Sequence, residues 1–184
     1  MQWRWLSQEI PYTGCELRSG WIADTAGIEG DALVAFVGPC EVPLEHMVDM
    51  EDVRRGVPIK AARMMHFLAE HFDTDLARTV LRQRLLVCLT AEILNQVISE
   101  LVRRDGDDLF IGERKLSVSI ATASPVSTLI HLGLNIDPSG APVPAIGLDE
   151  LGVPVAEVAE QIMAAYVEEM QSCRTARNKV RRVP

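Results

Sequence analysis

The pattern of apolar and polar positions predicts strands at the beginning of the chain. Short apolar runs between turn residues indicate strands at residues 1–10, 17–24 and 32–37. The triplet Tyr12-Thr13-Gly14 is typical of a turn between the first two strands. We therefore expect the chain to begin with part of a sheet.

The middle and the end of the chain show the spacing of helices. Residues 60–72 carry an apolar stripe that predicts a helix ending before Thr74. Residues 75–103 repeat apolar residues every four positions, which predicts a long amphipathic helix capped by Thr74. Its apolar positions are Leu81, Leu85, Leu89, Ile93, Val97 and Leu101. Pro154 precedes a last helix, expected at residues 155–173.

Residues 107–136 predict a meander of three strands with a lysine at the start of the second. The strands are expected at residues 108–111, from Lys115 onward, and at residues 126–136. After Lys115, the only ionisable side chain of the segment is His131, so we expect a sheet that is buried on at least one face. A lysine that enters a buried sheet needs an anionic partner, which a bound phosphate or carboxylate could supply. The alternative is a lysine that protects a sheet edge.

The meander resembles a known group of enzymes at the residues GERKLSVSIAT and IHLGLNI. This group comprises biotin protein ligases, lipoate protein ligases and octanoyltransferases. The resemblance implies an α+β fold with helices packed on a mixed sheet, related to the catalytic core of class II aminoacyl-tRNA synthetases. It also implies that Lys115 holds an acyl or acyl-adenylate group.

Two segments differ from the pattern of these enzymes. The sequence TGCELRSGWIAD replaces the Gly/Arg-rich loop that closes over the adenylate in the ligases, and residues 137–148 lack the cysteine that octanoyltransferases use. A ligase and an acyltransferase therefore remain alternatives. Over nearly the whole chain, GPCEVPLEHMVDMEDVRRG and ERKLSVSIATASPVSTLIHLG are similar to the family catalogued as domain of unknown function 366.

A second candidate segment, residues 36–52, follows an expected buried strand. Loops after core strands often carry chemistry, because the rigid scaffold positions them. Cys40 and His46 could form a thiolate–imidazole pair there, which makes both catalytic candidates beside Lys115. Glu45, His46 and Asp49 could instead bind a metal ion, although we assign none. The acids of this segment could also form the solvated face of a short helical turn.

Further polar residues are candidates for ligand binding around Lys115. Alternate residues of one strand face the same side, so Ser117 and Ser119 should lie beside Lys115, and Arg18 would add a second positive charge. The full set is Arg18, Ser19, Ser117, Ser119, His131 and Asn135. Two functions follow as alternatives. One is an enzyme for a small carboxylate or adenylate, with no cofactor assigned; the other is a non-catalytic binding or assembly module whose acidic segment 41–52 is the interaction surface.

Composition limits the remaining possibilities. A chain of 184 residues with 48% hydrophobic content and no Pro/Gly/Ser-rich linker predicts one domain over residues 1–184, with residues 173–184 as a flexible basic tail. The formal charge of -8 disfavours a nucleic-acid-binding protein. No apolar run reaches the roughly 18 residues that span a membrane. The four cysteines lack C-x-x-C spacing and no signal-peptide pattern is present, so we expect a cytoplasmic protein; a homodimer is a further expectation.

Overall fold

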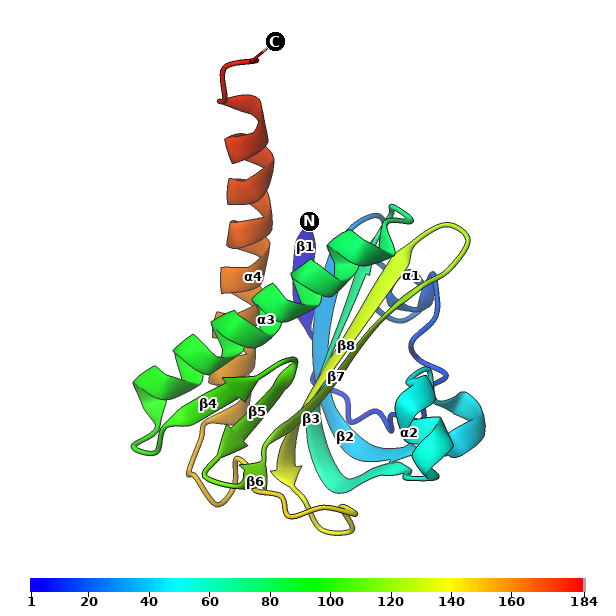
Figure 1. Cartoon of the computed structure of the whole chain (residues 1–184), viewed down its shortest axis with the longest axis vertical. Helices are drawn as coiled ribbons and strands as arrows, with labels where there is room; N and C mark the ends of the chain where they lie inside the picture. Colours follow the sequence, from blue (N-terminus) through cyan, green and yellow to red (C-terminus); the bar gives the residue numbers. More distant parts are fainter. Residues whose placement is uncertain (184) are drawn as a thin grey trace.

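A five-stranded mixed sheet forms the centre of the protein in the computed structural model, which describes residues 1–183 (Figure 1). Strand β1 is parallel to β2, whereas the other neighbours are antiparallel. The order across the sheet is β1 (Gln2–Trp5), β2 (Ala32–Val42), β3 (Ile59–His71), β8 (Thr128–Asp137) and β7 (Ser117–Ala123). The predicted α+β class with a mixed sheet is confirmed.

Helices cover the two faces of this sheet unequally. The long helices α3 (Leu76–Val97) and α4 (Val155–Asn178) pack on one face, and the far end of α4 projects beyond the sheet (Figure 1). The other face carries α1 (Trp21–Ala26), the 3-10 turn η1 (Leu44–His46) and α2 (Met50–Arg55). A small sheet of β4 (Val102–Asp105), β5 (Asp108–Ile111) and β6 (Arg114–Lys115) lies beside α3.

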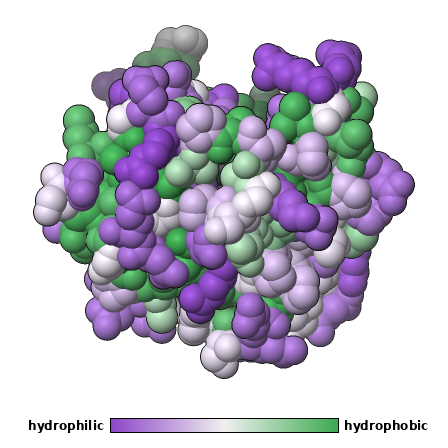
Figure 2. Space-filling model, turned by 90° about the horizontal axis from the view of Figure 1, so that it is seen from below, coloured by the Kyte–Doolittle hydropathy of each residue, from purple (hydrophilic) through white to green (hydrophobic). Residues whose placement is uncertain are grey.

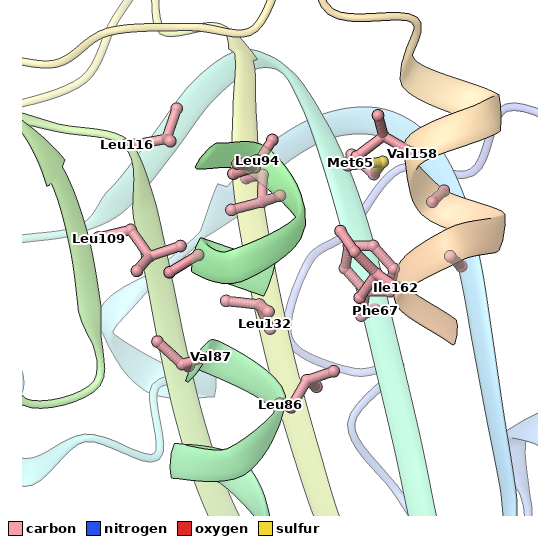
Figure 3. Close-up of a cluster of buried hydrophobic side chains, with 14 of the residues drawn as sticks. Met65, Phe67, Leu86, Val87, Leu94, Leu109, Leu116, Leu132, Val158 and Ile162 are labelled. Atoms are coloured by element: carbon pink, nitrogen blue, oxygen red, sulfur yellow. The ribbon is translucent and has the colours of Figure 1, made fainter. Parts of the chain in front are cut away.

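Each face of the sheet has its own hydrophobic core. In the larger core, Met65, Phe67 and Leu132 of the sheet pack against Leu86 of α3 and Ile162 of α4 (Figure 3). The smaller core joins alternate strand residues to the N-terminal segment, and it contains Tyr12, Ile22, Val34, Phe36, Val42, Met64 and Leu68. Both faces of the central strands are therefore buried, and the thinner cover over the smaller core leaves room for a cleft.

Strand β3 replaces the helix that the sequence predicted at residues 60–72, so that prediction was wrong. The segment pairs with β2 along one side and with β8 along the other. Because both of its faces are covered, burial is continuous from Met64 to His71. An apolar run of this kind fits a buried strand or a buried helix equally well, and pairing with two neighbours decided the outcome.

The N-terminal strands were predicted only in part. The first strand is shorter than expected, and the strand predicted at residues 17–24 does not form, because Trp21–Ala26 is the helix α1. Gly20 precedes this helix with φ 78°, a conformation that glycine adopts without strain. The strand predicted at residues 32–37 is confirmed, and it continues to Val42 through an irregularity between Gly38 and Cys40.

The long helix after residue 75 is confirmed, but it ends at Val97 rather than at residue 103, because the chain then enters strand β4. Its cap and its buried face also differ from the prediction. Asp75, rather than Thr74, is the N-cap and accepts a hydrogen bond from the N–H of Arg78. The fully buried apolar positions are offset from the predicted stripe and include Leu86 and Leu94, whereas Leu81 is 70% exposed. The predicted apolar positions therefore lie at the edge of the buried face of α3 rather than at its centre.

The meander and the last helix formed with two differences. Lys115 belongs to the small sheet, and the chain crosses into the main sheet at Leu116, so the meander contributes to two sheets. Helix α4 begins at Val155 as expected and continues to Asn178, so the predicted tail is helical over residues 173–178. Residue 184 lies outside the described residues. Across residues 1–183, no helix combines the length and the apolar character that crossing a bilayer requires.

Candidate functional site

A cleft of about 250 Å³ lies on the thinly covered face of the sheet. Its walls come from the N-terminal loop, from the η1–α2 segment and from strands β6, β7 and β8, which places it toward the lower end of the molecule in Figure 1. Hydrophilic and hydrophobic side chains are mixed over this lower end (Figure 2). The residues that line the cleft include Tyr12, His46, Arg55, Asp108, Lys115, Val118, Ile120 and His131.

Lys115 lines the cleft and is held there from three sides. Its N–H donates to the carbonyl of Pro144, and its carbonyl accepts from Ile146 and from the side chain of Asn135. Its ammonium lies 2.8 Å from Oδ2 of Asp108 on the neighbouring strand, and both side chains are about one-quarter exposed, at 28% and 27%. A second hollow of about 220 Å³ meets the cleft at Lys115 and Arg55. Lys115 therefore lines both cavities.

Acidic residues outnumber cations around the cleft. Arg55 pairs with Glu51 at 2.5 Å, and Lys115 pairs with Asp108. Burial raises the pKa of Asp108, an effect that Lys115 opposes. The other lining acids are Asp49, Asp52 and Asp107. A negatively charged ligand would thus share each cation with a carboxylate that the protein already provides.

The acidic segment before α2 has a structural role. Asp49 caps α2 by accepting from the N–H groups of Glu51 and Asp52. Within residues 1–183, the structure brings no three His, Cys, Asp or Glu side chains together in a group that could hold a metal ion, and Glu45, His46 and Asp49 do not form such a group. These acids form a capped helical turn at the rim of the cleft.

His46 lines the cleft, but its sulfur neighbour is Cys15 rather than Cys40. The Sγ atom of Cys15 lies 3.5 Å from Nδ1 and 3.9 Å from Nε2 of His46. Such similar distances put the sulfur off the axis of either nitrogen lone pair. Cys40 is buried against Tyr12, and burial raises the pKa of its thiol to about 12. The prediction of a Cys40–His46 pair was therefore wrong, because Cys40 follows the alternation of strand β2 and faces the smaller core together with Phe36 and Val42.

Arg18 and Ser19 do not line the cleft, which corrects their prediction as ligand-binding residues. Arg18 forms an exposed ion pair with Asp24 at 2.8 Å. Ser19 donates to the buried carboxylate of Glu70 at 2.8 Å, and its Oγ lies 2.9 Å from Oγ of Ser127. Both residues precede α1, a helix that the sequence prediction missed, so their side chains serve the packing of that helix.

Three other predicted ligand-binding residues lie beside Lys115, with their polar atoms already bonded within the protein. Ser117 Oγ accepts from the N–H of Leu109, and Ser119 Oγ accepts from Gln83 and donates to the carbonyl of Asp107. The side-chain amide of Asn135 donates to the carbonyl of Lys115 at 3.2 Å. These contacts tie the small sheet to the main sheet and fix the position of Lys115.

His131 reaches the inner end of the cleft together with Tyr12, which the sequence analysis did not select. The two rings stack with centroids 3.9 Å apart. Tyr12 was predicted only as part of a turn, and Arg55 was not predicted as a site residue. A large aromatic residue inside a Gly-containing turn was the available signal for Tyr12, since turn residues are usually small and polar.

The family model with the description "Domain of unknown function (DUF366)" matches residues 1–181. The chain belongs to this family. A relative in Methanocaldococcus jannaschii, described as an uncharacterised protein, is 40% identical over 172 residues, covering 90% of this chain and 77% of the relative. The solved structure of a protein of unknown function from Pyrococcus horikoshi is 42% identical, with a TM-score of 0.91 over 99% of this chain and 100% of that one.

More distant solved structures show what the fold of this DUF366 member resembles. A biotin protein ligase from Aquifex aeolicus in complex with biotin has a TM-score of 0.60 at 14% identity, covering 93% of this chain and 70% of that one. A putative lipoate protein ligase from T. acidophilum with bound lipoic acid has a TM-score of 0.56 at 13% identity, covering 93% and 87%. The protein therefore has a fold of the biotin and lipoate protein ligase type.

Proposed function

We propose that the cleft binds a small carboxylic acid, or its adenylate, through Lys115, and that the protein acts on it as a ligase or acyltransferase. One observation carries this proposal: the Lys115 ammonium lies in the cleft with Asp108 as its charged partner at 2.8 Å. An ammonium has three N–H donors, so donors remain for a ligand oxygen. Arg55 lines the same cleft and can support a second anionic group.

Support also comes from the fold. Solved structures of this type include a biotin protein ligase in complex with biotin and ATP and a putative lipoate protein ligase with bound lipoic acid. Biotin and lipoic acid are both small carboxylic acids. At these identities the likeness concerns the fold, so the ligand of the present protein has to be tested directly.

Lys115 can assist either reaction through its charge. In a ligase, a carboxylate oxygen attacks the α-phosphorus of ATP, which forms an acyl adenylate and releases pyrophosphate. In an acyltransferase, an acceptor nucleophile attacks an activated acyl group and displaces its leaving group. Negative charge develops on oxygen in both cases, and a fixed ammonium in a partly buried cleft stabilises it.

Thermal-shift titration with ATP, biotin, lipoate and octanoate tests the binding step. A true ligand raises the stability by RT ln(1 + [L]/Kd), and Lys115→Met should abolish the shift without loss of fold. Lys179→Met is the matched control, because Lys179 follows α4 far along the chain from the cleft. An acid that stabilises both variants equally would contradict a role for Lys115.

Two assays separate the chemical alternatives. Acid-dependent exchange of pyrophosphate into ATP indicates a ligase, and release of free thiol from an acyl thioester indicates an acyltransferase. Binding without either activity supports the alternative of a non-catalytic binding module. The pairing of each cleft cation with a protein carboxylate is the observation that favours this alternative. That the protein is cytoplasmic and that it forms a homodimer both remain predictions.

A further inference from the structure

Two buried histidines on neighbouring strands form a hydrogen-bond chain that ends at the cleft. Nε2 of His66 on β3 lies 3.3 Å from the carbonyl oxygen of Gly38, and Nδ1 of His66 lies 3.1 Å from Nε2 of His131 on β8. Burial lowers the pKa of His66 to about 3, and burial together with the nearby His66 holds the pKa of His131 well below its ordinary value. Both rings are therefore neutral at pH 7, with one proton each.

The carbonyl at the start of this chain fixes the position of both protons. The oxygen of Gly38 can only accept, so Nε2 of His66 carries the proton and Nδ1 of His66 accepts. Nε2 of His131 must then donate to that nitrogen. Nδ1 of His131 is left without a proton, and it can act only as a hydrogen-bond acceptor.

The free nitrogen of His131 is open to the cleft. His131 is 3% exposed, and it lines the cleft. Within residues 1–183, every enclosed side-chain nitrogen or oxygen has a hydrogen-bond partner except Nη1 of Arg82, which forms an ion pair with Asp73 at 2.8 Å. No hydrogen bond within residues 1–183 engages Nδ1 of His131, so this atom contacts the open space of the cleft.

Tyr12 supplies a second polar atom at the same place. Its ring stacks on His131, it is 3% exposed and it lines the cleft. Its hydroxyl is likewise without a partner in residues 1–183 and is not enclosed. Burial raises the pKa of Tyr12, so the phenol stays protonated and can donate. The apolar side chains of Val118 and Ile120 also line the cleft. The cleft therefore extends from the neutral polar groups of His131 and Tyr12 to the ammonium of Lys115.

We infer that the inner end of the cleft selects a ligand with a neutral N–H group of the amide or urea class, which donates to Nδ1 of His131. The carbonyl of the same group can accept from the hydroxyl of Tyr12. This inference rests on the proposed function, in which the ligand carboxylate lies at Lys115. The ligand class is thus a carboxylic acid with an apolar middle and an amide-like end. A purely aliphatic acid would leave Nδ1 of His131 buried without a partner, which costs binding free energy.

Three acids of equal chain length test the inference by isothermal titration calorimetry at pH 7. Octanoate has an apolar end, suberic acid monomethyl ester has an end that only accepts, and suberic acid monoamide has an end that donates and accepts. We expect the monoamide to bind roughly tenfold more tightly than either of the others. In His66→Leu, which no longer fixes the tautomer of His131, the advantage of the monoamide over the ester should shrink while octanoate binding stays constant.

The tautomer can be measured without any ligand or variant. Nitrogen-15 NMR of histidine-labelled wild-type protein should show His131 protonated at Nε2 and free at Nδ1. A proton on Nδ1 would overturn the inference, and so would equal binding of the three acids or tighter binding of the ester. If none of the acids binds at millimolar concentration, the proposed function fails together with this inference. Binding without preference for the monoamide removes the inference alone.

Discussion

The ammonium of Lys115 and the carboxylate of Asp108 lie 2.8 Å apart on neighbouring strands of the small sheet. This pair decides how strongly the cleft can attract an anion, because Asp108 neutralises the charge that a ligand would use. The partial burial of both side chains strengthens the interaction relative to an exposed ion pair.

Asp108→Asn should therefore increase the affinity of the cleft for octanoate. We expect roughly a threefold to tenfold lower Kd, measured by calorimetry, because the ammonium then lacks a competing negative charge. Asp105→Asn is the control, since Asp105 pairs with Arg103 at the exposed end of the same hairpin. Unchanged or weaker binding in Asp108→Asn would mean that Lys115 does not hold the ligand carboxylate.

The buried face of α3 can be tested with two leucines of the same helix. Leu86 is fully buried in the larger core, and Leu81 is 70% exposed (Figure 3 labels Leu86). Leu86→Ala should lower the free energy of unfolding by about 2 to 5 kcal/mol, and Leu81→Ala by less than about 0.5 kcal/mol. Urea denaturation measures both. Similar losses in the two variants would contradict the orientation of the helix.

The sequence predicted the parts of the fold that have a clear local signal. Strand β2 begins with the uninterrupted apolar run of residues 32–37, and α3 has a long helical period. Strand β3 has neither signal, because it is covered on both faces and contains good helix formers such as Ala61, Met64 and Leu68. Only its pairing with β2 and β8 makes it a strand, and pairing partners cannot be read from a local window.

The lack of long-range information in the local sequence also explains which candidate site residues were predicted correctly and which were not. Lys115, His46 and His131 all line one cleft, and each was selected because polar chemistry occurs beside a predicted buried strand. Cys40 was selected for the same reason and Arg18 as a second positive charge, but Cys40 faces the smaller core and Arg18 belongs to the segment that leads into the helix α1. Features of that kind are set by tertiary packing rather than by local sequence.

Glu70 anchors the loop that precedes α1. Its buried carboxylate accepts from Ser19 Oγ at 2.8 Å, from the N–H of Gly20 at 3.1 Å and from Ser127 Oγ at 2.6 Å. Glu70→Ala should cost about 2 to 3 kcal/mol of unfolding free energy, because these donors lose their acceptor inside the protein. The exposed Glu41→Ala is the control, with an expected cost below about 0.5 kcal/mol. A small loss in Glu70→Ala would show that water replaces the carboxylate.

Asp31 should make the stability of the protein depend on pH in the acid range. His71, the N–H of Phe72 and the guanidinium of Arg174 hold the pKa of Asp31 below its ordinary value of 3.8. The unfolded chain then binds a proton more readily than the folded protein, so the stabilisation is complete above about pH 5 and is lost as the pH falls through 3.8 and below. The Asp31 carboxylate is only partly exposed, so screening by solvent removes little of this effect.

Asp31→Asn isolates this contribution. The variant keeps an acceptor for the N–H of Phe72 but carries no charge for Arg174. We expect it to be less stable than the wild type by about 1 to 2 kcal/mol at pH 6, with the difference shrinking toward pH 2. Urea denaturation at several pH values measures the two curves, and Asp24→Asn is the control because its pair with Arg18 is exposed. A constant difference from pH 6 to pH 2 would mean that Asp31 stabilises the protein through packing and neutral hydrogen bonds, with no contribution from its charge.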